Sequence, residues 1–277
     1  MEVKATVPEE LNMHIVFRVK KNLFSINGGD VLSIQKLPKK LLHIPYAPDY
    51  VRGSYQNLGE IVTVVDLRRF FEWNTSEEEY DAFTNMIDQR KSDHIHWVET
   101  LKTCRRTGKA FTLAKDCHQC ALGKWRDTYE TDVPTINRLL NALDKPHAEL
   151  HSLADHVLQD TEESSERILT RMDEELVPEV LKILDTMKED FRDHEFREMV
   201  ILLRGGLRVA LTVDEVLGVE TLRKQISGGL PLMRQGKNYI RGVRQRMGDD
   251  ELVMELDIPL LSSNLDLSAV VDATHTN

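Results

Sequence analysis

The chain of 277 residues is 41% hydrophobic and 30% charged, a composition that is typical of globular proteins and argues against long disordered segments. Its net charge of −10 disfavours non-specific binding to nucleic acid and to anionic membranes, and no apolar run approaches the ~20 residues of a membrane-spanning helix. Residues 1–11 lack the basic and apolar pattern of a secretory signal, so we expect a cytoplasmic protein without membrane insertion.

The first predicted elements are β-strands. Short apolar runs lie at residues 14–19, 23–26 and 31–34, and a run rich in β-branched residues covers 60–67. The Asn-Gly-Gly sequence at 27–29, between the second and third runs, is a turn signal. We therefore expect the N-terminal part of the chain to be a β structure.

Helical spacing replaces this pattern after residue 75. It predicts helices over 76–108, 117–130, 133–159 and 161–193. Pro146 and Pro178 fall inside these patterns, so we expect a kink or break near each. Four helices of this kind suggest a bundle.

The helical part also differs in composition. The residues from Phe71 to Asp190 include 26 acidic and 15 basic side chains, a net charge of −11, whereas the rest of the chain has a net charge of +1. The same segment holds all three cysteines, all three tryptophans and six of the ten histidines. Clustered histidines beside an odd number of cysteines favour metal ligation or a reactive thiol over a disulfide framework.

Strand patterns return at residue 198. The runs 199–203 and 207–213 flank Gly205-Gly206 and predict a hairpin, and another strand is expected at 252–256. Two architectures fit this order: three consecutive domains, or one β domain interrupted by a helical module. Neither β segment shows a complete core of its own, which favours the interrupted domain. The expected parts are a first β half at 12–75, a helical insert at 76–194, a second β half at 195–263 and a flexible tail at 264–277.

Four residues of the helical part form a candidate metal site. His147 and His151 are one helical turn apart, so both imidazoles lie on one helix face and can share an ion. Cys120 stands near the start of a predicted helix, where the helix dipole stabilises a metal-binding thiolate. With His94, in the later half of the first long helix, these side chains complete the tetrahedral set that Zn²⁺ prefers.

A second ligand set uses the Cys-x-x-Cys unit of Cys117 and Cys120. Together with His147 and His151 this unit gives two cysteines and two histidines. The separation of Cys120 from His147 exceeds the gap of about 12 to 15 residues that is usual in zinc fingers. On the residues alone, His94 and Cys117 are competing candidates for the fourth ligand.

Three motifs carry a family resemblance. They are His-x-x-Trp at His94–Trp97, Cys-x-Leu-Gly-x-Trp at Cys120–Trp125 and Leu-x-x-x-His-x-x-Leu-His at Leu143–His151. In this order and at helical positions they resemble the motifs of the chemoreceptor zinc-binding (CZB) domain, a four-helix module. The resemblance implies one zinc ion per chain, bound by His94, Cys120, His147 and His151.

The same resemblance assigns roles to the neighbouring residues. Cys117 becomes an extra thiol beside the site, and Trp97 and Trp125 become core residues. Related zinc modules pair as homodimers, so the resemblance also implies a homodimer through the helical insert.

The flanking β segments contain His43–Gly53, Val62–Arg68, Val213–Val219 and Tyr239–Val243. These stretches are similar to CheW-like domains, the coupling proteins that join bacterial chemoreceptors to the histidine kinase CheA. The resemblance implies a mixed fold, a split all-β domain of two small β-barrel subdomains with an inserted α-helical four-helix bundle. It further implies a non-enzymatic scaffold whose partners are a CheA-like histidine kinase, chemoreceptors or both.

The sequence departs from the adaptor family at one position. Leu58 stands where the family usually has an arginine that contributes to partner contacts. Leucine cannot replace arginine at an ion-paired interface, because it offers neither the charge nor the hydrogen-bond donors.

We therefore expect an adaptor in which the zinc module senses either zinc or an oxidant. In the second case the zinc-bound thiolate of Cys120 is oxidised to a sulfenic acid, which weakens ligation. The alternatives are a zinc hydrolase with Glu149 as general base, and an adaptor with purely structural zinc. Asp66 and Asp214 are interpreted as turn or cap residues, so no catalytic residue is predicted.

Overall fold

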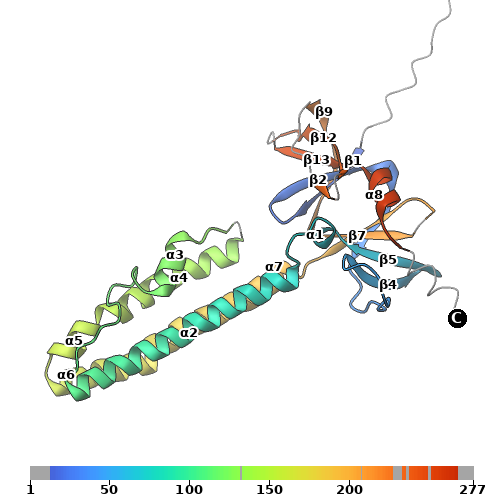
Figure 1. Cartoon of the computed structure of the whole chain (residues 1–277). Helices are drawn as coiled ribbons and strands as arrows, with labels where there is room; N and C mark the ends of the chain where they lie inside the picture. The colour runs from blue at the N-terminus through green and yellow to red at the C-terminus, as the bar shows by residue number, and fades with distance from the viewer. Residues whose placement is uncertain are drawn as a thin grey trace, which may run out of the picture. The chain divides into compact units, whose positions relative to one another are not determined.

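The computed structural model describes residues 13–131, 133–206, 208–226, 233–234, 237–248 and 251–267 (Figure 1). By their internal contacts they divide into two compact units. The β unit takes the residues up to Thr75 together with those from Phe196 onward, and the helical unit runs from Ser76 to Glu195. The flexible tail expected at 264–277 lies outside the described residues from position 268 on.

A six-stranded sheet of the β unit has the order β8-β1-β2-β13-β12-β9. Its strands are β1 (Met13–Val19), β2 (Asn22–Asn27), β8 (Glu215–Thr221), β9 (Arg223–Ile226), β12 (Ile240–Gln245) and β13 (Leu252–Leu256). The hairpin β1–β2 comes from the first β segment, whereas β8 pairs with β1 and β13 pairs with β2 from the second. Neither segment can therefore complete this sheet alone.

A five-stranded sheet repeats this mixing, in the order β3-β6-β7-β5-β4. Its strands are β3 (Val31–Lys36), β4 (Val51–Asn57), β5 (Glu60–Asp66), β6 (Met199–Leu203) and β7 (Val209–Val213). Strand β6 pairs antiparallel with β3, and β7 pairs parallel with β5. A small separate hairpin is formed by β10 (Met233–Arg234) and β11 (Lys237–Asn238). The β unit is thus one domain assembled from both segments.

One apolar core joins the two sheets and the short helices α1 (Leu67–Phe70) and α8 (Ile258–Asn264). An ion pair ties the two β segments together beside it: Arg68 donates from Nε to Asp214 Oδ1 at 2.9 Å and from Nη2 to Oδ2 at 2.6 Å. Asp66 caps α1 by accepting the Arg69 N–H at 3.1 Å. Asp66 is therefore a cap residue, as predicted, whereas Asp214 acts as an ion-pair partner of Arg68.

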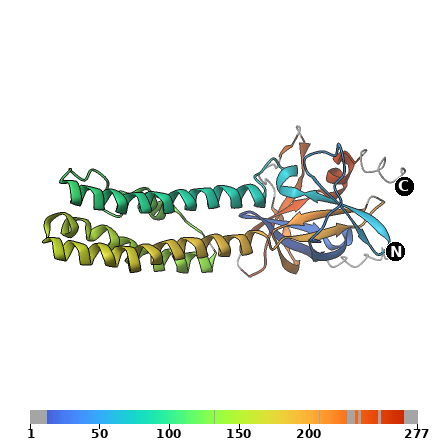
Figure 2. The same ribbon diagram turned by 90° about the horizontal axis from the view of Figure 1, so that it is seen from below.

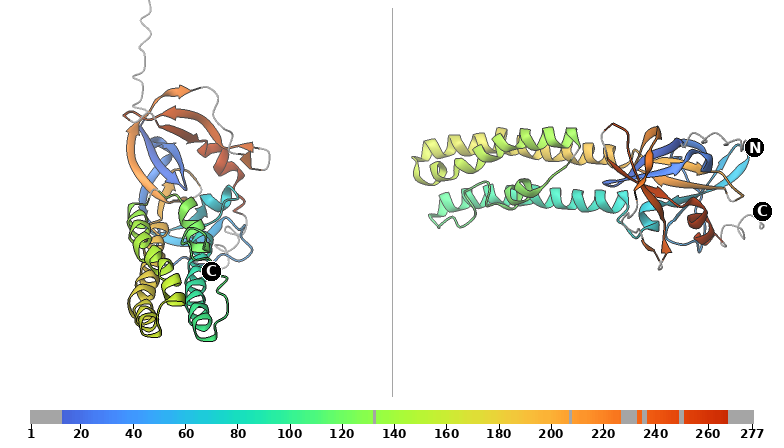
Figure 3. Two further views of the ribbon diagram at one scale, coloured as in Figure 1. Left: turned by 90° about the vertical axis from the view of Figure 1, so that its left-hand side faces the viewer. Right: turned by 90° about the horizontal axis from the view of Figure 1, so that it is seen from above.

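The helical unit contains three long helical stretches that lie alongside one another (Figures 2 and 3). They are α2 (Ser76–Thr107), α4 (Pro134–Ser152) and a continuous stretch made of α6 (Glu162–Arg171), a π-helical turn (Met172–Leu176) and α7 (Val177–Glu195). Helix α7 packs against both α2 and α4. The segment predicted as a helix over 117–130 forms only the eight-residue α3 (Ala121–Thr128), and α5 (Ala154–Gln159) follows α4.

The proline predictions have different outcomes. No break occurs at Pro146: α4 continues to Ser152, and the helix is interrupted only at Leu153. Pro146 is buried, so the packing of its ring offsets the hydrogen bond that its missing N–H cannot make. Pro178 is the second residue after the π-helical turn, and its missing N–H leaves a carbonyl of that turn without its usual helical donor.

Candidate metal centre

The four side chains singled out in the sequence come together inside the helical unit. His94 comes from α2, Cys120 is the N-cap residue of α3, and His147 and His151 come from one face of α4. One ligand atom from each lies within 4.8 Å of the others. The three histidines are only 3%, 4% and 2% exposed in chain order, and Cys120 is half-buried.

The distances within this group suit a single small ion. Cys120 Sγ lies 3.3 Å from His147 Nε2 and 3.9 Å from His94 Nε2. In a tetrahedral zinc site, Zn–N bonds near 2.0 Å and Zn–S bonds near 2.3 Å put the ligand atoms about 3.3–3.6 Å apart. The two distances from the Cys120 sulfur are therefore within about 0.5 Å of the spacing that zinc requires, and no pair of ligand atoms exceeds it by more than about 1.5 Å.

The outer ring nitrogens of two histidines are already held by backbone carbonyls. His94 Nδ1 lies 2.8 Å from the Arg90 carbonyl oxygen, and His151 Nδ1 lies 3.2 Å from that of Ala114. An Nδ1–H that donates to a carbonyl leaves the Nε2 lone pair for a metal. The Nε2 of His151 is buried and makes no hydrogen bond within the described part of the chain. A buried ring nitrogen without a hydrogen bond fits a metal ligand.

Trp97 explains the tryptophan of the first motif. Its indole N–H donates to the Ala114 carbonyl oxygen at 2.8 Å, the same atom that His151 approaches. Its ring also lies 4.6 Å from the His151 ring, centroid to centroid. Trp97 is a core residue, as predicted, but it also holds the carbonyl that orients a candidate ligand. Ala114 carried no side-chain signal in the sequence because it acts through its backbone.

Gly123 explains the glycine of the second motif. Its N–H donates to Cys120 Sγ at 3.2 Å. A Cβ at this position would lie 1.9 Å from the Cys117 carbonyl oxygen and 2.9 Å from the His118 Cα. Only glycine therefore lets the Cys117–Cys120 turn pack onto the first turn of α3, which places the Cys120 sulfur at the group.

The histidines of the group are neutral at neutral pH. Burial, together with the smaller effect of the neighbouring histidines, lowers the pKa of His147 to about 3 and that of His151 to about 4. Burial also lowers the pKa of His94. Neutral imidazole is the form that binds metal, so no proton has to leave these rings when an ion binds.

The thiol behaves differently from the sequence expectation. Burial raises the pKa of Cys120, even though the N–H groups of Gly123 and Leu122 act in the opposite direction. The helix start is thus present, but desolvation outweighs it, and the thiolate would need the positive charge of a bound metal. Three neutral imidazoles and one thiolate would leave a zinc centre with a net charge of +1.

The rival ligand and the candidate general base lie outside the group. The structure brings His94, and not Cys117, into contact distance with the other three ligand atoms. Glu149 on α4 is ion-paired with Arg171 instead. A metal held by all four of these donors would have no open coordination position for a catalytic water.

The apolar core continues on both sides of the group. One cluster includes Ile87 and Leu143, which precede His94 and His147 along their helices, and the other includes Trp97 and Leu150, which follow them. The four polar side chains thus form a layer between two apolar clusters. Such a layer is costly to bury unless its polar atoms are paired.

Comparison with known protein families identifies two domains. Residues 14–93 match the CheW-like domain, and residues 94–158 match the chemoreceptor zinc-binding domain. The second family is a zinc-binding domain, and this chain has a His/Cys/His/His group close enough to hold a metal ion. The boundary between the two matches falls inside α2, whereas the compact units divide at Thr75 and Ser76.

No curated protein matches the chain. Among solved structures, the scaffolding protein TtCheW from Thermoanaerobacter tengcongensis aligns over 89% of this chain and 89% of its own, with 11% identity and a TM-score of 0.38. None of the described helices is long and apolar enough to cross a membrane.

Proposed function

We propose that this chain is a cytoplasmic chemotaxis adaptor that couples chemoreceptors to a CheA-like histidine kinase under the control of a zinc-binding sensor. A CheW-like part followed by a chemoreceptor zinc-binding part supports this proposal. Both are scaffold and sensor families rather than enzyme families. The observation that carries the sensor role is the buried group of His94, Cys120, His147 and His151, which we propose as the ligands of one zinc ion.

The four proposed zinc ligands come from different helical elements, so zinc binding affects how these elements pack. The ligands come from α2, the start of α3 and α4, so one ion would tie three helical elements together. Loss of the ion, or of the Cys120 thiolate, would leave polar atoms unsatisfied between two apolar clusters. Each buried polar group without a partner costs about 1–3 kcal/mol, enough to change how the helices pack.

The chain connections between the helical unit and the β unit allow a change in helix packing to affect the β unit. The helical unit is joined at Ser76 and at Glu195 to a β unit whose strands come from both sides of it. Any rearrangement of α2 or α7 therefore acts on the chain at two connections into the same domain. This supports regulation of coupling over a zinc ion that serves only to stabilise the fold.

The standard docking contact of the adaptor family is altered in this chain. Leu58 and Gly59 form the two-residue turn between β4 and β5, both with positive φ, and Leu58 is 98% exposed. An exposed leucine at this turn suits an apolar contact rather than an ion pair. We propose that partner binding here uses the leucine side chain in place of the usual arginine.

A capture experiment tests the proposal. The zinc-loaded protein, the chelator-treated protein and the His94→Ala/His147→Ala variant would each be used to capture CheA-like kinases and chemoreceptors from the host, with metal content measured on each sample. We expect one zinc per chain in the wild type alone and different amounts of captured kinase or receptor with and without zinc. Equal capture by all three would contradict zinc control, and no capture by any would contradict the adaptor role.

The homodimer that the zinc family implies stays a prediction. It is tested by the mass of the zinc-loaded chain in light scattering, compared with that of a chain whose helical segment 76–195 has been replaced by a short linker. A dimer that persists after this replacement would place the dimer contact in the β unit.

A further inference from the structure

Cys117 has no part in the group of candidate ligands, yet its backbone is built into the same turn. Cys120 Sγ lies 3.2 Å from the Cys117 carbonyl oxygen. The intervening C=O and Cα–C bonds are about 1.2 and 1.5 Å long, so the Cys120 sulfur is at most about 6 Å from the Cys117 Cα. The two thiols are close enough to interact electrostatically.

The turn between the two cysteines is fixed by its own hydrogen bonds. The Gln119 N–H donates to the Asp116 carbonyl oxygen at 3.0 Å, and the His118 N–H donates to Asp116 Oδ1 at 2.9 Å. Gly123 packs directly against the Cys117 carbonyl on the other side. The backbone therefore holds Cys117 in the turn that leads into the helix start at Cys120, the spacing at which Cys-x-x-Cys pairs form reversible disulfides.

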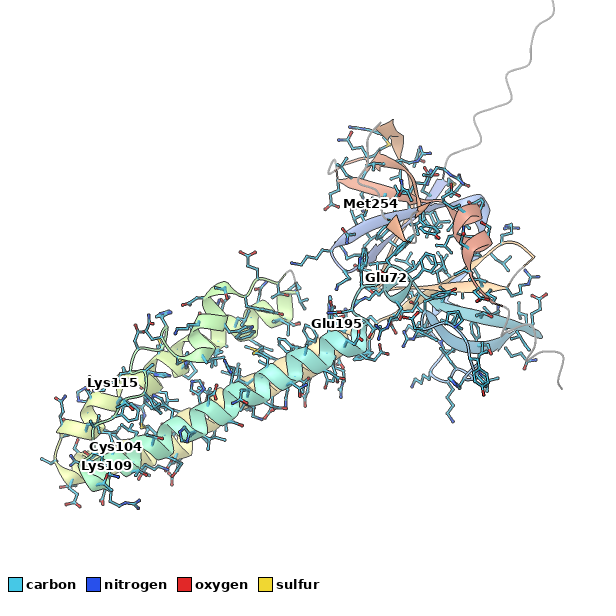
Figure 4. The ribbon with its side chains drawn as sticks, viewed as in Figure 1. Glu72, Cys104, Lys109, Lys115, Glu195 and Met254 are labelled. Carbon is cyan, nitrogen blue, oxygen red and sulfur yellow. The ribbon has the colours of Figure 1, made fainter. Side chains whose placement is uncertain are left out.

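The thiols of Cys117 and Cys120 also differ in exposure and in their proposed roles. Cys117 is partly exposed and belongs to none of the described metal groups, whereas Cys120 is a proposed zinc ligand. The third cysteine, Cys104, is buried near the end of α2, where its sulfur lies 3.6 Å from the Ala110 carbonyl oxygen (Figure 4). Only Cys117 is thus both accessible and within reach of the Cys120 sulfur.

We propose that Cys117 is the resolving thiol of the zinc centre, which captures oxidised Cys120 as an intramolecular disulfide. The inference rests on the proposed zinc site and on an oxidant as its input. In the first step the Cys120 thiolate transfers two electrons to hypochlorous acid, forming an S–O bond and releasing chloride. In the second step the Cys117 sulfur attacks, the S–S bond forms, the S–O bond breaks, and the oxygen leaves with the thiol proton as water.

The disulfide makes the response reversible. A sulfenic acid without a neighbouring thiol is oxidised further to a sulfinic acid, which dithiol reductants do not restore. Capture by Cys117 stops this progression and leaves a bond that a dithiol can reduce, after which Cys120 can bind zinc again. The structure thus assigns Cys117 the task of protecting the ligand rather than of binding the metal.

The test compares full-length, zinc-loaded wild type with Cys117→Ser and with Cys104→Ser as the matched control. Each protein receives two equivalents of hypochlorous acid, enough to carry an uncaptured sulfenic acid on to the sulfinic acid. Zinc release is then followed with a chromophoric chelator, and free thiols are alkylated for intact-mass and peptide analysis. We expect wild type and Cys104→Ser to lose two hydrogen atoms, to contain a peptide linked through Cys117 and Cys120, and to regain zinc binding after dithiothreitol. Cys117→Ser should instead gain oxygen at Cys120 and regain severalfold less zinc binding.

Each failure has its own signature. Zinc release from the wild type with oxygen on Cys120 and a free Cys117 would overturn the resolving role while leaving the oxidant-sensing function in place. A disulfide between two chains would also overturn the intramolecular capture. A wild type that binds no zinc, or that keeps zinc and all its thiols after treatment, would overturn both this inference and the oxidant-sensing version of the proposed function.

Discussion

Replacing Gly123 with alanine tests the metal centre without removing a ligand. The added Cβ would lie 1.9 Å from the Cys117 carbonyl oxygen, a backbone atom that cannot rotate away. Because contacts of this kind are not found below 3.0 Å, the turn and the start of α3 have to separate by about 1 Å. The Cys120 sulfur sits between these two segments and moves with them.

The size of the effect follows from the tolerance of metal sites. Overpacking of this kind costs about 1–3 kcal/mol of folding free energy. Zinc–ligand distances vary by only about 0.2 Å, so a displacement of about 1 Å at Cys120 strains or breaks one of the four bonds. Loss of support around a ligand lowers metal affinity about 10–100-fold. We expect the zinc affinity of Gly123→Ala to fall within this range.

The assay is a competition titration of zinc against a chromophoric chelator, with helix content followed by circular dichroism. Gly108→Ala is the matched control in the same unit, because Gly108 has a φ of +66° but open space around its Cβ position. That control should lose about 1 kcal/mol of stability, from the left-handed backbone, and keep its zinc affinity. The reasoning would be refuted if Gly123→Ala bound zinc as tightly as Gly108→Ala.

Three further predictions follow from other contacts. His94→Ala should lower zinc affinity by more than 100-fold while Cys117→Ser leaves it unchanged, as measured by the same titration; the reverse pattern would make Cys117 the fourth ligand. Asp214→Ala should destabilise the β unit by about 3 kcal/mol in urea unfolding, because it removes a carboxylate that is ion-paired with the buried Arg68, and zinc content should stay at one per chain. Burial lowers the pKa of His14, so the folded state keeps this ring neutral while the unfolded chain takes up a proton below pH 6.5. Stability should therefore fall as the pH drops below 6.5, by at most about 1.4 kcal/mol per pH unit from this residue, and His14→Gln should show a correspondingly shallower decline.

Much of the local structure could be predicted from the sequence, because it depends on short-range patterns. The runs expected at 14–19, 23–26 and 31–34 fall within β1, β2 and β3, and the long helix expected to stop at Gly108 ends at Thr107. The helix interruption at Leu153, in place of the one expected at Pro146, could not be predicted this way. Whether a proline breaks a helix depends on the packing of its ring, and periodicity does not describe that packing.

The pairing of the strands could not be predicted from the sequence pattern either. Apolar alternation shows that a strand exists and which face it buries, but it does not name the partner strand. The parallel contact between β2 and β13 joins residues from opposite ends of the chain, and no turn signal connects them.

In the candidate metal centre, the roles of side chains could be predicted from the sequence, whereas the roles of backbone groups could not. The four candidate ligands could be selected because histidine and cysteine carry their chemistry in the side chain. The roles of Ala114 and Gly123 come from a carbonyl and from a missing Cβ, which a sequence pattern does not reveal. The raised pKa of Cys120 could not be predicted, because burial outweighs the helix start and depends on the tertiary structure.

The pairing of strands across the helical unit also sets the order in which a newly made chain can fold. Strands β1 to β5 leave the ribosome first, yet β1 needs β8, with Met13 opposite Thr221, and β3 needs β6. The helical unit is contiguous in sequence and its contacts are more local, so it can form while those strands still wait for their partners. The four candidate ligands can thus come together and bind zinc during synthesis, before the β unit has formed. A shortage of zinc would then first slow the folding of the helical unit.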